Sequence, residues 1–222
     1  MNKSILIAAL FTSLFTPAFA EEKNPEDPTK IITKVGAGYT NSKLTFSGSL
    51  GLDEARMMNV TVNDDASEWN VGGSWLFDIG ILNFSVRKSD YGEGAVNTSY
   101  NIGSFIPTSE FNFTPWSWQP FITFGYSYND GVSVEDGVEK EIQSHSGYIG
   151  GFALKPLNDK WTALAFAGTT QGQNDLSSYW GGGGISHRLS DNHSLNVLGI
   201  VVDSSIYGDE QRLNINYRYE FN

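Results

Sequence analysis

The stretch LNINYRYEF, from Leu213 to Phe221, decides the fold. Its apolar and aromatic residues occupy every second position, and the positions between them hold Asn, Arg and Glu. Because successive side chains of a β-strand point to opposite faces, this period of two predicts a strand with one apolar face and one polar face. The same alternation recurs upstream, most clearly in 69–77 and 118–128. The sequence therefore predicts an all-β protein of many amphipathic strands.

Segments with this alternation predict about ten strands. The predicted strands span 36–51, 69–77, 81–90, 98–113, 118–129, 145–155, 161–170, 179–189, 194–202 and 212–221. The first segment changes parity between Tyr39 and Leu44, so either a bulge or a junction of two strands is expected near 41–43. A count of eight strands, with the N-terminal region outside the sheet, is the alternative.

The connections between these segments alternate in length along the chain. Short turns, such as 78–80, follow one set of strands, and longer polar stretches, such as 53–67 and 130–143, follow the other set. A meander whose tight turns lie at one end and whose long loops lie at the other is typical of membrane-spanning barrels. This pattern predicts an antiparallel up-and-down transmembrane β-barrel, with a secreted β-sandwich as the alternative.

Composition excludes several functional classes. The 222 residues include no Cys, so disulfide scaffolds, thiol nucleophiles and Cys-based zinc sites are excluded. Lys and Arg number 14 against 25 Asp and Glu, and a chain with so few clustered cations is not expected to bind nucleic acid. The 24 Gly and 14% aromatic residues suit short strands better than helices.

The N-terminus has the features of an export signal. Lys3 precedes an apolar stretch, and Ala18-Phe19-Ala20 is typical of a cleavage site, so 1–20 is predicted to be a signal peptide. Residues 21–30 combine charge with two prolines and no apolar residue, which predicts a disordered periplasmic leader. The barrel is expected to occupy 31–222, in the outer membrane.

Lipid outside the sheet is predicted to sort the side chains into two sets. Large aromatic residues near the strand ends are expected to form girdles at the membrane surfaces. The girdle residues are Trp69, Phe77, Trp116, Trp118, Tyr126, Tyr128, Tyr148, Trp161, Tyr217, Tyr219 and Phe221. Polar residues of the opposite face are expected to line the lumen, where charges must pair or stay hydrated. The lumen-facing candidates are Asn83, Arg87, His145, Lys155, Arg218 and Glu220.

Three stretches carry a resemblance to a known class. They are WQPFITFGYSY (118–128), GGGGISHRLSDNHSLNV (181–197) and LNINYRYEF (213–221). In their glycines, aromatics and turn residues they resemble the small outer-membrane β-barrels of Gram-negative bacteria, of the opacity and adhesin types. The resemblance implies contact with outer-membrane lipid and lipopolysaccharide, recognition by the barrel-insertion machinery and a monomeric barrel. Asn222 follows the final aromatic residue, whereas such barrels usually end on it.

No motif points to catalysis or to a cofactor. The three histidines, His145, His187 and His193, lack metal-ligand spacing on one strand face. Ser186 and His187 are adjacent in a predicted strand, so their side chains point to opposite faces and cannot form a nucleophile–base pair. The chain is therefore expected not to be an enzyme and to need no cofactor or metal.

Acidic residues concentrate in the predicted long loops. They are Asp53, Glu54, Asp64, Asp65, Glu135, Asp136, Glu139, Glu141, Asp203, Asp209 and Glu210. Such loops stay solvated and repel one another, and they offer a surface to an extracellular ligand. The sequence predicts a non-enzymatic barrel that serves envelope integrity or surface interaction such as adhesion. The alternative is a narrow porin-like channel for small solutes or ions.

Overall fold

The computed structural model describes residues 24–40, 43–135 and 137–221. The predicted signal peptide, 1–20, lies outside them. Within these ranges no helix is long and apolar enough to cross a membrane. The described elements are β1 (Lys34–Thr40), β2 (Lys43–Gly51), β3 (Arg56–Asn63), β4 (Trp69–Phe77), β5 (Gly80–Gly92), β6 (Ala95–Pro107), the 3-10 helices η1 (Thr108–Phe111) and η2 (Pro115–Ser117), β7 (Gln119–Glu135), β8 (Val138–Pro156), β9 (Trp161–Gly172), β10 (Ser177–Arg188), β11 (His193–Ser204) and β12 (Gly208–Glu220).

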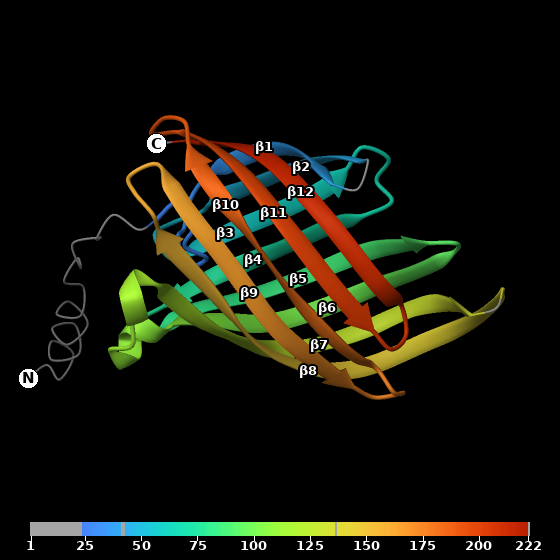
Figure 1. Cartoon of the computed structure of the whole chain (residues 1–222). Helices are drawn as coiled ribbons and strands as arrows, with labels where there is room; N and C mark the ends of the chain where they lie inside the picture. Colours follow the sequence, from blue (N-terminus) through green and yellow to red (C-terminus); the bar gives the residue numbers. More distant parts are fainter. Residues whose placement is uncertain (1–23, 41–42, 136, 222) are drawn as a thin grey trace, which may run out of the picture.

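These strands form one closed antiparallel barrel, seen from the side in Figure 1. Each strand pairs with its sequence neighbours, and β1 closes the sheet by pairing with β12. In that closing pair Lys34 lies opposite Glu220 and Gly36 lies opposite Arg218. Closure leaves no sheet edge along the wall, which satisfies the backbone polar groups without water.

The barrel has twelve described strands, so the predictions of ten and eight were wrong. The segment predicted as one strand, 36–51, is the antiparallel pair β1 and β2, which confirms the alternative of two strands meeting near 41–43. The predicted loop 53–67 contains β3. Acidic residues on both sides of β3 made this stretch resemble a polar loop, although its Met58, Val60 and Val62 alternate with polar residues.

The two ends of the barrel differ in their connections. Lys34 and Glu220 lie at one end, named here the terminal end, which also holds the connections 52–55, 78–79 and 108–118. The opposite end is named the hairpin end, because β7 and β8, with 17 and 19 residues, project there beyond the other strands (Figure 1).

This arrangement separates acidic residues that were expected to share one loop. Asp53 and Glu54 lie in the turn between β2 and β3 at the terminal end. Asp64 and Asp65 follow β3 at the hairpin end. The prediction of one long acidic loop over 53–67 was therefore wrong, because β3 crosses the wall between the two pairs.

The outer face of the barrel is apolar. Phe124, Tyr217 and Phe221 expose 44%, 40% and 48% of their surface, whereas Arg218 and Glu220 each expose 6%. A protein in water rarely leaves so continuous a row of large apolar side chains uncovered. The greasy face of LNINYRYEF thus points outward and its charged face points inward, which is the arrangement of a barrel in lipid.

The inner face is not polar throughout. At the terminal end Phe152 lies 5.9 Å from Phe121 and 6.3 Å from Phe105, measured between ring centroids. Ile81 and Leu154, which are completely buried, lie beside them on β5 and β8. A barrel of this strand number has room inside for packed side chains. The described barrel therefore contains an internal apolar core, which the expectation of a uniformly polar interior did not include.

Candidate functional site in the barrel lumen

Four of the six residues predicted to line the lumen face inward. Asn83 and Arg87 lie on the inner face of β5, where they pair with Gly103 and Ser99 of β6. Arg218 and Glu220 lie on the inner face of β12 and are buried. Arg218 and Glu220 belong to a charged cluster at the terminal end, Arg87 lies at the hairpin end, and Asn83 belongs to the polar wall between the two ends.

The other two candidates, His145 and Lys155, lie on the outer face of β8. The Tyr126 hydroxyl contacts His145 Nδ1, and Lys155 Nζ lies 5.6 Å from the Trp118 ring centroid. The prediction failed because it placed the large residues of β8 toward lipid. In the structure Tyr148, like Phe152, faces inward, so residues of the opposite parity face outward.

The structure places the predicted girdle residues in different positions. Tyr148 is an inner residue and does not belong to a girdle. Trp116 exposes 86% of its surface in the connection between β6 and β7. The other predicted girdle residues have the outer-facing parity. Tyr126 and Tyr128 lie in the middle of β7, and the rest lie at or near strand ends: Trp69, Phe77, Trp118, Trp161, Tyr217, Tyr219 and Phe221.

The cluster at the terminal end is built around Glu26, which comes from the segment before β1. Its carboxylate accepts hydrogen bonds from the Arg218 guanidinium, with Nη1 3.1 Å from Oε2, and from Ser186 Oγ at 2.7 Å. The side chains of Glu26 and Arg218 each expose 7% of their surface. A two-oxygen, two-nitrogen pair of this kind is among the stronger interactions of side chains.

The same segment makes further contacts across the terminal end. Lys30 Nζ lies 3.1 Å from Glu220 Oε2, and Asn24 Nδ2 donates to Thr162 Oγ1 at 3.2 Å. Arg218 Nε lies 3.2 Å from Glu220 Oε1, which is an ion pair without hydrogen-bond geometry. Residues 24–33, part of which was expected to be a leader, thus connect β9 with β12 across the lumen.

Sequence reasoning missed Glu26 and Lys30 as lumen residues. A usable signal was the excess of cations on the inward-facing parity, where Lys34 and Arg218 outnumber Glu220, the one acid on the inner face of β1 and β12 at that end. Buried cations need counter-charges, so a partner from outside the strands could have been inferred.

The polar wall between the two ends carries a chain of hydrogen bonds. Ser49 Oγ donates to Asn59 Oδ1 at 2.7 Å, and Asn59 Nδ2 donates to Ser74 Oγ at 3.1 Å. Ser74 Oγ in turn donates to Asn83 Oδ1 at 2.6 Å. This chain follows the inner face from β2 to β5, and Asn214 and its neighbours continue the polar lining on β12.

A polar cavity of about 200 Å³ occupies the hairpin end of the lumen. Its charged lining residues are Arg87 and Glu210, and most of the rest carry hydroxyl or amide groups. Arg212 Nε donates to Glu210 Oε1 at 2.6 Å and Arg212 Nη1 donates to Glu68 Oε2 at 3.1 Å. Within residues 24–40, 43–135 and 137–221, Arg87 makes no hydrogen bond or ion pair and is exposed to this cavity.

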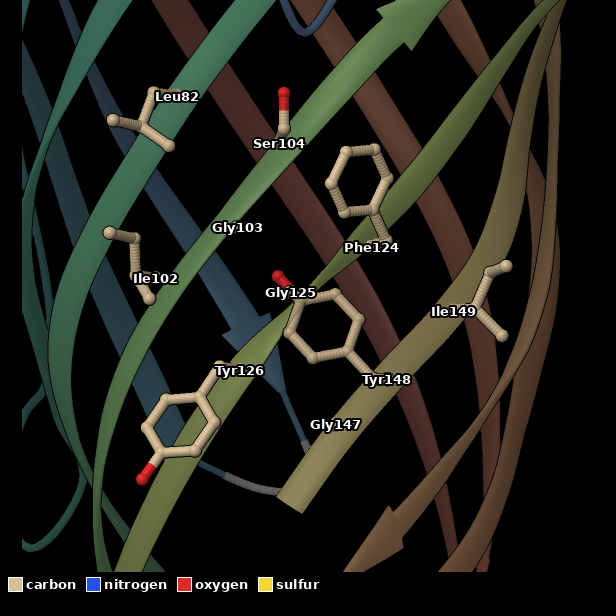
Figure 2. Close-up of a pocket in the computed structure, with 10 residues that line it drawn as sticks. All are labelled: Leu82, Ile102, Gly103, Ser104, Phe124, Gly125, Tyr126, Gly147, Tyr148 and Ile149. Atoms are coloured by element: carbon tan, nitrogen blue, oxygen red, sulfur yellow. The ribbon is translucent and has the colours of Figure 1, made fainter. Parts of the chain in front are cut away.

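A separate groove of about 490 Å³ lies on the outer wall over β5 to β8 (Figure 2). Its walls are apolar side chains such as Leu82, Ile102 and Ile149. Figure 2 shows the Tyr148 ring beside Gly125. A Cβ on Gly125 would lie 2.6 Å from Tyr148 Cζ, so glycine is what lets this ring lie flat against the inner wall. The groove therefore belongs to the lipid-facing surface and is separate from the lumen cavity.

Comparison with known proteins identifies the fold. No protein-family model and no curated protein matches the chain. Among solved structures, it is similar to the translocator domain of autotransporter NalP from Neisseria meningitidis, at 13% identity and a TM-score of 0.61 over 88% of this chain and 90% of that one. The chain has the fold of an outer-membrane β-barrel.

Two channels support the same conclusion. The NanC porin structure matches at 10% identity and a TM-score of 0.53, over 85% of this chain and 100% of that chain. An outer membrane channel from Pseudomonas putida F1 matches at 11% identity and a TM-score of 0.51, over 90% and 100%. The predicted resemblance to outer-membrane barrels is confirmed at the level of the fold.

The described lumen contains ion pairs and hydrogen-bonded polar side chains. Among the described residues, no group of three or more His, Asp or Glu side chains is placed to hold a metal ion. His187 stacks on Trp161 on the outer face at 4.0 Å between centroids, away from the inward-facing Ser186.

Proposed function

We propose that the protein is a narrow outer-membrane channel for small polar solutes, closed at the terminal end by residues 24–33. The observation that carries this proposal is the buried contact of Glu26 with Arg218. The closing element is not a barrel strand, so it can leave the lumen without breaking the sheet. The porin folds among the neighbours support the same function.

The polar wall supplies the route. Asn59, Asn214 and Asn216 are half-buried inside the barrel, between the cavity at the hairpin end and the charged cluster at the terminal end. The apolar core fills the other side of the terminal end. Release of Glu26 would leave Arg218 and Lys34 facing an open polar path, with no change in strand pairing.

The proposed location follows from the same arrangement. The outer apolar face meets the lipid of the outer membrane, and the hairpin end faces the cell exterior. Export is expected to use the predicted signal peptide, and membrane assembly the barrel-insertion machinery. We propose a monomeric, non-enzymatic protein.

Single-channel recording in planar bilayers tests the proposal. The intact protein is expected to open rarely, and Glu26→Gln is expected to open at least tenfold more often, because Gln keeps the size of Glu26 but loses its charge. Glu54→Gln, in the exposed turn between β2 and β3, is the matched control and should behave like the intact protein. An equal frequency of opening in all three proteins would contradict the proposal.

Surface interaction is the second candidate function, and the projecting hairpin of β7 and β8 favours it. Val138 exposes 67% of its surface beyond the barrel, next to the exposed Glu139, Lys140 and Glu141. Deletion of 131–140 is expected to leave the bilayer behaviour unchanged. Loss of binding to host cells or matrix in that variant would support adhesion, and unchanged binding would exclude the hairpin as the binding surface.

A further inference from the structure

The carboxylate of Glu26 occupies a set of donors that belongs to the barrel strands. Arg218 Nη1 donates to Oε2 at 3.1 Å and Arg218 Nη2 donates to Oε1, so the guanidinium meets both oxygens. Ser186 Oγ donates to Oε1 at 2.7 Å, and Asn196 Nδ2 donates to Oε2 at 3.4 Å. Each carboxylate oxygen therefore accepts two hydrogen bonds. We name Ser186, Asn196 and Arg218 the carboxylate socket.

The sheet holds the socket in place, and the segment that carries Glu26 does not. The three donors face inward on neighbouring strands, Ser186 on β10, Asn196 on β11 and Arg218 on β12, and the strand pairing fixes their spacing. Glu220 Oε1 lies 3.2 Å from Arg218 Nε and holds the guanidinium from its other side. Withdrawal of Glu26 would therefore leave the socket assembled and without its occupant.

The charges around the socket suit an anion. The inner face of β1 and β12 at the terminal end carries Lys34 and Arg218 against Glu220, an excess of one positive charge. Residues 24–33 carry one net negative charge and bring Glu26 to this place. A buried cation without a counter-ion is unfavourable, so the socket favours another anion when Glu26 leaves.

The geometry of the socket favours a carboxylate over other groups. A guanidinium binds the two oxygens of a planar carboxylate through two parallel N–H groups. An amide in the same place would point an N–H group at the Arg218 donors. A phosphate dianion would bring a second negative charge beside Glu220, which shares the same guanidinium.

We infer that the socket binds the carboxylate of a small organic acid, which competes with Glu26 and so opens the channel. The inference rests on the proposed function, because it names the class of solute that the channel admits and the signal that releases its closing segment. The half-buried Asn214 and Asn216 of the polar wall suit the uncharged remainder of such a solute. Glu26 is part of the same chain, so a free acid is expected to compete only at about 1 mM or above.

Isothermal titration of the full chain in detergent micelles tests the site directly. Glu26→Ala removes the internal carboxylate and leaves its space empty, whereas Glu26→Gln fills that space with an amide. Acetate is expected to bind Glu26→Ala about tenfold more tightly than Glu26→Gln, and acetamide is expected to bind neither. No binding of acetate to Glu26→Ala, equal binding to both variants, or tighter binding of inorganic phosphate than of acetate would overturn the inference.

A pair of serine substitutions on β10 locates the site. In the Glu26→Ala chain, Ser186→Ala removes one donor of the socket, so the affinity for acetate is expected to fall about three- to tenfold. Ser178→Ala makes the same change on the inner face of the same strand at the hairpin end, and should leave the affinity unchanged. An equal effect of the two substitutions would place acetate elsewhere and overturn the inference.

Planar bilayers test the competition in the intact protein. Sodium acetate is expected to raise its opening frequency about threefold over the same concentration of sodium chloride, by mass action on the open state. Glu26→Gln should open equally often in both salts, because its closing contact is already lost. No effect of acetate on the intact protein would overturn the inferred opening.

The two proposals fail separately in these experiments. Acetate binding to Glu26→Ala, together with equal opening of the intact protein and Glu26→Gln, would refute the channel and leave the site. More frequent opening of Glu26→Gln, together with no acetate binding to Glu26→Ala, would refute the site and leave the channel.

Discussion

Two stretches of the inner wall at similar depth use opposite chemistry. From β2 to β4 the wall is held by the hydrogen bonds of Ser49, Asn59 and Ser74. From β6 to β8 it is covered by Phe105, Phe121 and Phe152. Both stretches belong to strands whose outer faces meet lipid. The difference shows that the apolar character of a residue in this barrel does not predict whether it faces outward or inward. Apolar side chains are stable both against lipid and in the internal core.

The largest expected effect comes from the charged cluster that closes the polar side. Arg218→Ala leaves the buried Glu26 and Glu220 without their shared cation. Removing one partner of a buried ion pair costs about 3–5 kcal/mol of unfolding free energy. Arg56→Ala, which breaks the exposed pair with Asp53, should cost far less, because solvent screens that pair. Equal losses in denaturant titrations of the refolded barrel would contradict the buried cluster.

A second pair of variants compares the two faces of one strand. Phe121→Ala, in the internal core, is expected to cost about 3–5 kcal/mol, since it loses transfer free energy and leaves a cavity. Phe124→Ala, on the outer face, should cost only the transfer part of about 1.5–3 kcal/mol, because lipid chains refill the space. The same denaturant titrations measure both. A larger loss for Phe124→Ala would mean that the packed apolar core lies on the face of β7 that carries Phe124, which would contradict the account.

Substitution of an inward-facing glycine and of an outward-facing glycine compares the packing of the two faces of the wall. A Cβ on Gly168 would overlap the Trp180 ring and lie 2.7 Å from the Ile149 carbonyl oxygen, so Gly168→Ala is expected to cost about 1–3 kcal/mol. A Cβ on the outward-facing Gly151 would meet nothing closer than 3.8 Å. Gly151→Ala should therefore change stability by less than about 0.5 kcal/mol. A neutral Gly168→Ala would show that the apolar side of the lumen is loosely packed.

The smallest effect is expected at the rim of the polar side, in the turn after β3. Hydrogen bonds from Ser67 lower the pKa of Asp65 to about 2. Because the folded pKa lies below the unfolded value of about 3.9, the stabilisation is complete above that value and is lost as pH falls toward 2. Asp65→Asn should weaken amide-exchange protection of Ser67 at pH 5 and have little effect at pH 2. A pH-independent difference would exclude the charge as its cause.

The sequence predicted which residues of a strand share a face better than it predicted whether that face points inward or outward. Along β8, Tyr148 and Phe152 were placed correctly on one face, and His145 and Lys155 on the other. The direction of those faces could not be predicted, because it depends on an internal core that forms only when β6 and β7 bring their own phenylalanines alongside. On β12 one face is apolar and the other carries charged and polar residues. Which residues share a face and which face meets lipid were therefore both predictable.

The candidate site was predictable in its strand residues and not in its closing segment. Arg218 and Glu220 followed from the alternation of β12. Glu26 did not, because a charged, proline-containing segment has no periodicity that places its side chains. The cavity at the hairpin end, which Tyr207 and Asn97 both line, also required the three-dimensional structure, since it depends on which strands of the closed barrel face one another.

The central claim is that the terminal end of the lumen has a packed apolar side and a polar side that residues 24–33 close. The chain contains no cysteine, so a single introduced cysteine reports without background. Labelling by a small water-soluble thiol reagent should be slow for Asn216→Cys in the full chain and at least tenfold faster after deletion of 24–30, while Leu154→Cys stays unlabelled in both. Labelling of Leu154→Cys as fast as that of Asn216→Cys, or no acceleration on deletion, would contradict the account.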